Sequence, residues 1–112
     1  MRLDAYTVVF LRRPIHAPQM TDEALDELQR NHLAFWARLR EEGQVLVNGP
    51  FSGQPDPSLR GVAVLRTSVE EAARLAHEDP SVKAGRLVLE IFRWLVPHGS
   101  LGDHPTETVE QG

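Results

Sequence analysis

The chain has 112 residues, which suits one domain, although a core shared with a second chain would help so small a domain to fold. Its formal net charge is −4, with acidic and basic residues mixed along the chain, which argues against nucleic-acid binding. The absence of cysteine excludes disulfides, thiolate metal sites and a thiol nucleophile. No apolar run reaches the roughly 18 residues of a membrane span. The N-terminus lacks a signal-peptide pattern, so we expect a cytoplasmic protein that binds no membrane.

The first half of the chain predicts a strand, a long helix and a second strand. Residues 5–12 are rich in β-branched and aromatic side chains, a pattern typical of a strand. Thr21 is the expected N-cap of a helix that runs to about Glu42 and stops at the next glycine. A short apolar strand over residues 45–48 follows, and then a loop with several prolines and glycines.

The second half predicts a strand, a shorter helix and a long final strand. Residues 61–66 form the strand, and a capping box that starts at Ser68 opens the helix. This helix is expected to end near Asp79, because Pro80 disfavours helical geometry in the residue before it. The last strand covers residues 86–96.

The element order β-α-β-β-α-β predicts an α+β fold, the ferredoxin-like plait, over residues 1–97. Residues 98–112 are polar and contain glycines and prolines, so they are expected to form a flexible polar tail. The plait has one sheet face that its helices leave uncovered. The final strand is largely apolar on both sides, so we expect a second copy of the chain to bury that face in a homodimer, against the alternative of a monomer with an apolar open sheet. One side carries Leu87, Leu89, Ile91 and Leu95, and the other carries Val88, Phe92, Trp94 and Val96, interrupted by Glu90.

His32 is the first candidate for chemistry. It occupies a position in an apolar helical stripe, where it is expected to point toward the sheet. A core histidine bonded to backbone is the simpler interpretation; a general acid or base at the rim of a pocket is the functional one. The other members of the stripe are Leu25, Leu28, Phe35 and Leu39.

Asp79 is the second candidate. It is expected at the C-terminal end of the second helix, where the helix dipole disfavours an acid. A turn aspartate that bonds its own backbone is the simpler interpretation. Both helices pack on one sheet face in the predicted fold, so Asp79 is able to approach His32.

Other polar positions give weaker signals. Asn48, Gly49 and Pro50 end the second strand and are candidate substrate-binding residues, although a plain tight turn explains them as well. The remaining histidines have no metal-ligand spacing, so no metal site is expected and these side chains are interpreted as solvated. They are His16, His77, His98 and His104.

Two stretches resemble the YciI-like (YCII-related) family. The first is N-H-L-A-F-W-A-R-L-R-E-E-G-Q-V-L-V-N-G-P, which contains His32, and the second is S-V-E-E-A-A-R-L-A-H-E-D-P-S-V-K-A-G, which contains Asp79. With the first and last strands, the resemblance covers roughly residues 5–97. It implies a dimeric α+β barrel and an active site centred on a histidine and an aspartate, roles that fall on His32 and Asp79. The sequence departs from the family pattern at Gln29, where an arginine is frequent, and at Ser81, where an aromatic residue is frequent.

These observations predict a small enzyme that needs no cofactor, a lyase or hydrolase for a small molecule, with aromatic molecules among the candidates. His32 would move the proton and Asp79 would orient the ring or stabilise its charge. A non-catalytic ligand-binding or accessory domain is the first alternative. A relative of the dimeric-barrel monooxygenases or isomerases, with other residues in the pocket, is the second. A pocket with a direct contact between the two side chains favours the enzyme.

Overall fold

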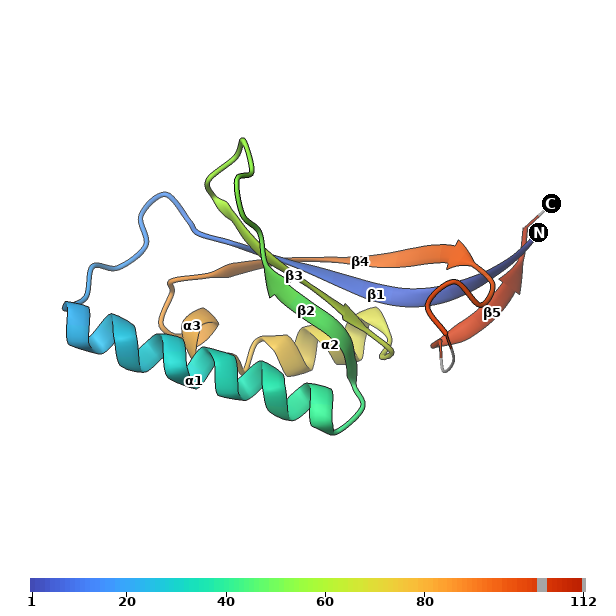
Figure 1. The fold of residues 1–112 in the computed structure, drawn as a ribbon, viewed down its shortest axis with the longest axis horizontal. Coiled ribbons are helices and arrows are strands. Elements are labelled where there is room, and N and C mark those ends of the chain that lie inside the picture. Colours follow the sequence, from blue (N-terminus) through green and yellow to red (C-terminus); the bar gives the residue numbers. More distant parts are fainter. Residues whose placement is uncertain (103–104, 112) are drawn as a thin grey trace.

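The computed structural model describes residues 1–102 and 105–111, which form one sheet with helices on one of its faces (Figure 1). The strands are β1 (Arg2–Arg12), β2 (Val45–Pro50), β3 (Leu59–Leu65), β4 (Val88–Pro97) and β5 (Glu107–Glu110), and the helices are α1 (Asp22–Glu41), α2 (Val69–Ala76) and α3 (Pro80–Lys83). The strand order is β2-β3-β1-β4, and all pairs are antiparallel. This order confirms the ferredoxin-like α+β prediction.

Helix α1 forms where the sequence predicts it. Thr21 is its N-cap and accepts a hydrogen bond from the backbone N–H of Ala24 at 3.2 Å. Gly43 follows the helix with a φ of 81°, a left-handed conformation that favours glycine. Trp36 and Leu39 are the buried residues of the helix. The predicted stripe omits Trp36, although its side chain is the more buried of the two.

The second helix ends earlier than predicted. It stops at Ala76, with His77 as its C-cap, and a separate short helix, α3, begins at Pro80 with Asp79 as its N-cap. The cause is Pro80, because the residue before a proline avoids helical geometry while proline itself fits the first helical position. Asp79 therefore lies at the N-terminal end of a helix, and the prediction that it ends the second helix is wrong.

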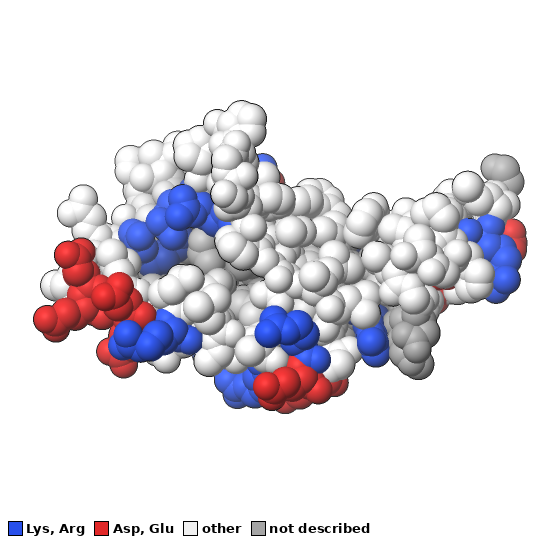
Figure 2. All heavy atoms as spheres, viewed as in Figure 1, with Lys and Arg blue, Asp and Glu red and all other residues white. Residues whose placement is uncertain are grey.

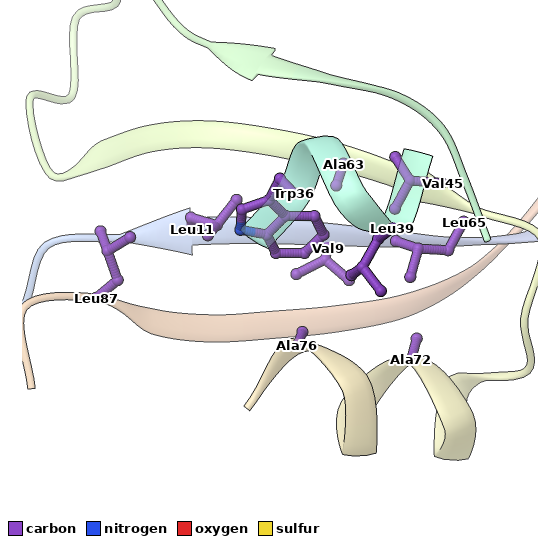
Figure 3. Packing of buried hydrophobic residues seen from close by; sticks show 10 residues of the cluster. All are labelled: Val9, Leu11, Trp36, Leu39, Val45, Ala63, Leu65, Ala72, Ala76 and Leu87. Atoms are coloured by element: carbon purple, nitrogen blue, oxygen red, sulfur yellow. The ribbon is translucent and has the colours of Figure 1, made fainter. Parts of the chain in front are cut away.

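The main core lies between the helices and the sheet. Figure 3 shows Trp36 and Leu39 of α1 packed over Val9 and Leu65 of the sheet, with Ala76 of α2 facing the same strands. Ala72 and Ala76 are the buried residues of α2, and their small side chains let this helix approach the sheet closely. Trp36 fills the space beneath α1.

The opposite sheet face has no helix over it in the described residues (Figure 1), and it carries several exposed apolar side chains. Phe92 and Trp94 of β4 lie on it with 51% and 43% of their surfaces exposed. Val47 and Val88 are also exposed on this face. Leu89 and Ile91 on the other side of β4 pack against the core. The prediction that β4 is largely apolar on both sides is therefore confirmed.

The prediction of a loose tail over residues 98–112 is wrong for its described part. Residues Glu107–Glu110 form β5, which pairs with Arg2–Ala5 of β1. Strand β3 pairs with β1 only from Thr7 onward, so the first residues of β1 leave a free edge that β5 occupies. Residues 103, 104 and 112 of the predicted tail lie outside the described residues.

His98 helps to hold this tail, which corrects the interpretation that it is simply solvated. Its Nδ1 donates to Asp4 at 2.8 Å, and the Gly99 N–H and the Thr108 hydroxyl donate to the same carboxylate at 2.8 and 2.9 Å. Asp4 is buried on β1, so the tail supplies the donors that this charge requires.

Within residues 1–102 and 105–111, no helix combines the length and apolarity that crossing a membrane would require.

Candidate active site

Asp79 is fully buried, and its carboxylate accepts three hydrogen bonds. Oδ1 accepts from the backbone N–H of Ser81 at 2.8 Å. Oδ2 accepts from Trp36 Nε1 at 2.8 Å and from His32 Nδ1 at 2.7 Å. Because a buried carboxylate is stable only when donors surround it, this network also fixes the position of the His32 ring.

Two helices position these side chains. His32 and Trp36 lie one turn apart on α1 and therefore point to the same side of the helix. Asp79 caps α3, with Pro80 in the first helical position and the Ser81 N–H bonded to the cap side chain. Since α1 packs against α3, the two parts of the network meet. The structure thus brings together the two residues that the sequence predicts as catalytic.

The hydrogen bond to Asp79 determines the tautomer of His32. An ionised carboxylate only accepts hydrogen bonds, so Nδ1 of His32 carries the proton and Nε2 remains for a ligand. In the neutral ring, Nε2 then holds a lone pair, which is the arrangement of a general base. The His32 side chain is 18% exposed and lines a pocket, whereas Asp79 lies behind it.

The pocket has a volume of about 160 Å³ and lies between α1 and the strands β1, β2 and β3. Polar and apolar side chains line different parts of it. The polar ones are Arg13, Gln29, His32, Asn48 and Arg60, and the apolar ones include Leu11, Leu33, Trp36, Val62 and Leu87. The arrangement suits a small molecule that has an apolar body and a few polar groups.

Asn48, Gly49 and Pro50 all line this pocket. The Asn48 side-chain oxygen accepts from Arg40 at 2.6 Å, so its amide nitrogen is the group best suited to donate to a ligand. The Gly49 carbonyl lies close to Gly61 of β3, where an added Cβ would come within 3.0 Å of the oxygen. Gly61 therefore permits the close backbone approach that forms this side of the pocket.

Sequence reasoning missed several residues of the site. Trp36 is four positions after His32, and this helical spacing is a signal that was there to be found. Arg13 and Arg60 carry no such signal, because Arg13 follows β1, Arg60 lies on β3, and only the fold brings both to one pocket. Burial lowers the pKa of the Arg13 guanidinium, and repulsion from Arg86 and Arg60 lowers it further.

A model of the YCII-related domain matches residues 7–95. The chain belongs to the YCII-related family. This YCII-related protein is 34% identical over 74 residues to the uncharacterized protein YjpA of Bacillus subtilis (strain 168), with 66% of this chain and 84% of YjpA covered. The match confirms the family that the sequence resembles.

A solved structure shares the fold. It is that of 5-chloro-2-hydroxyhydroquinone dehydrochlorinase from Burkholderia phenoliruptrix AC1100, in complex with 2,5-dihydroxybenzoquinone. The TM-score is 0.55 at 23% identity, with 88% of this chain and 99% of that chain covered. Among the described residues of the YCII-related protein, no three histidine, aspartate or glutamate side chains gather as metal ligands.

Proposed function

We propose that this YCII-related protein is a small enzyme that needs no cofactor, in which His32 moves a proton to and from a small molecule. The observation that carries the proposal is the 2.7 Å hydrogen bond between His32 Nδ1 and Asp79 Oδ2, beside a pocket that His32 lines. A cytoplasmic location remains a prediction from the sequence.

Each residue of the pair has a distinct part in the proposed reaction. Nε2 of His32 takes a proton from the substrate or from a water molecule, and the imidazolium that forms is stabilised by the Asp79 carboxylate. Asp79 is a positioning residue, since it is buried behind the ring. Removal of a proton next to a leaving group gives a lyase, and activation of water gives a hydrolase. The dehydrochlorinase named above acts on a chlorinated aromatic molecule, which supports the lyase.

The alternatives are weaker on the same observations. A non-catalytic accessory domain would not require a histidine held in one tautomer beside a pocket. A monooxygenase-like or isomerase-like relative would place other residues where the pair lies. We also propose that the protein works as a homodimer that uses the open sheet face.

The function is tested with 5-chloro-2-hydroxyhydroquinone and other small aromatic molecules, by chloride or product release. Replacing His32 by Gln should reduce turnover by about a hundredfold or more, because the general base is lost. His16→Gln is the matched control, since His16 is exposed on the loop after β1 and lies outside the pocket. Turnover that survives His32→Gln would contradict the role of the histidine.

The pair is tested without any substrate by ¹⁵N NMR of the ring nitrogens. The parent protein should show His32 with its proton on Nδ1. In Asp79→Ala this preference should be lost, because no side-chain oxygen remains to accept a hydrogen bond from Nδ1. An unchanged tautomer would separate the two residues and would favour the accessory domain.

A further inference from the structure

The charged side chains that line the pocket are positive. Arg13 and Arg60 line it, and Arg86 lies close enough to Arg13 to act on its charge. No aspartate or glutamate lines the pocket among the described residues. Figure 2 shows basic side chains gathered above the N-terminal half of α1.

The contacts of these arginines orient them without cancelling their charge. Arg13 Nε donates to the Arg86 carbonyl at 2.8 Å, and Arg86 Nη1 donates to the Pro18 carbonyl at 2.8 Å. Arg60 Nη1 donates to the Pro57 carbonyl at 3.3 Å. A carbonyl fixes a guanidinium but carries no full charge, so the site remains cationic.

The preceding residue shows the contrast. Arg12 pairs with Glu90 and, at 2.9 Å, with Asp56. Arg13, by contrast, forms no ion pair with a carboxylate in the part of the chain that the structure describes. Adjacent arginines therefore differ: one is neutralised by the protein, and the other remains cationic in the pocket.

A bound anion would reduce the repulsion between these positive charges. Burial and two neighbouring cations lower the pKa of Arg13, which means that they disfavour its charged form. A carboxylate placed between Arg13 and Arg60 would supply the missing opposite charge, and guanidinium groups match its geometry.

The rest of the pocket limits the size and character of the ligand. The volume is about 160 Å³, and an apolar cavity of about 150 Å³ is known to hold one benzene molecule. Leu33, Trp36 and Leu87 supply an apolar wall for such a ring.

We propose that the pocket binds a compact organic acid, with a ring-sized apolar body against Trp36 and a carboxylate bound by Arg13 and Arg60. This inference rests on the proposed function and adds the substrate class, because it places the acid in the same pocket as His32. The carboxylate is the handle for recognition, and the chemistry takes place at the part of the ligand that faces Nε2 of His32.

The test compares benzoate with benzamide by calorimetric titration of the full chain. The two probes share size and ring but differ in charge. Benzamide should bind at least about tenfold more weakly than benzoate, because it lacks the charge-assisted hydrogen bonds. Arg60→Gln and Arg13→Gln should each weaken benzoate by about tenfold and leave benzamide unchanged. Arg60 is exposed, so that variant keeps the fold if Arg13→Gln does not.

Arg74→Gln is the matched control. It removes the same charge from the exposed Arg74–Glu71 pair on α2, outside the pocket, and should leave benzoate binding unchanged. The inference is overturned by equal binding of both probes, by no benzoate binding, or by equal weakening in Arg74→Gln. Inorganic phosphate that binds as tightly as benzoate would also overturn it, since a ring-sized site would then play no part.

The inference and the proposed function fail separately. His32→Gln should keep the preference for benzoate over benzamide even when turnover is lost. If the pocket prefers benzoate but the His32 tautomer does not depend on Asp79, the organic-acid site is supported and the acid–base pair is contradicted. If the tautomer depends on Asp79 but the pocket binds benzoate and benzamide equally, the acid–base pair is supported and the organic-acid site is contradicted.

Discussion

At the scale of single residues, Asp79 connects the fold to the chemistry. Its three donors come from α1 and α3, so the buried charge holds the two helices in register while it orients the His32 ring. Trp36 has two parts in this arrangement, because its ring fills the core and its Nε1 is one of the donors. Packing and positioning therefore depend on the same side chain.

Asp79→Asn should destabilise the protein. The amide offers one accepting oxygen and one donating NH₂, and whichever way it turns, the NH₂ faces the N–H of either Ser81 or Trp36. Leaving one buried donor unpaired costs about 1–3 kcal/mol, which urea denaturation would detect. Asp26→Asn on the exposed side of α1 is the control and should change the free energy of unfolding by less than about 0.5 kcal/mol. Equal stability of parent and Asp79→Asn would show that the network contributes little.

The residues of the site differ in how far the sequence predicts them. His32 is predictable because a polar residue interrupts a helical apolar stripe. The approach of Asp79 follows from topology, even though the helix that it was assigned to ends three residues earlier. Arg13 and Arg60 are not predictable in this way, since they are far apart in the sequence and only the pairing of β1 with β3 brings the loop after β1 and the start of β3 to one pocket.

At the scale of elements, the four strands of the plait and its long helix follow from local patterns, whereas α3 and β5 do not. Helix α3 has four residues and depends on a proline at its start, so it has no periodicity to detect. Strand β5 is short and polar, and it pairs because β1 extends beyond β3. The free edge of β1 depends on where β3 stops pairing, so the sequence of residues 107–110 alone does not reveal that they form a strand.

The attachment of β5 should depend on pH through Asp4. The Gly99 N–H, and then His98, hold the pKa of the Asp4 carboxyl at about 2, below its ordinary value of 3.8. A folded-state pKa below the unfolded one means that this carboxylate stabilises the docked tail above pH 3.8, and that the stabilisation is lost as the pH falls from 3.8 to about 2. NMR signals of Thr108 should report release of the tail in that range.

Two variants make this prediction specific. Asp4→Asn removes the titrating group, so the Thr108 signals should no longer change between these pH values. Asp22→Asn removes an exposed carboxylate from the first turn of α1 and should leave the transition in place. A transition that persists in Asp4→Asn would assign it to another group.

At the scale of the whole molecule, the two faces of the sheet differ in whether helices cover them. One face is covered by α1, α2 and α3, and the other presents Val47, Val88, Phe92 and Trp94 to solvent. Several large apolar side chains exposed on one face are characteristic of an interface. Phe92 also packs edge-on against Phe10, with ring centroids 6.1 Å apart, so the patch presents a fixed surface to a partner.

We propose a second copy of the chain as the partner of this face, because two such sheets can pack face to face and bury their aromatic residues together. Light scattering at micromolar concentration should therefore give about twice the chain mass of 12.6 kDa. Trp94→Lys should shift the mass to that of one chain, since a lysine buried in an apolar interface would lose its hydration without gaining a partner. Ile15→Lys is the matched control, because Ile15 is 94% exposed on the loop after β1 and belongs to no strand, and this variant should remain a dimer. A parent protein of single-chain mass would refute the dimer, and a dimer that tolerates Trp94→Lys would place the interface elsewhere on the molecule.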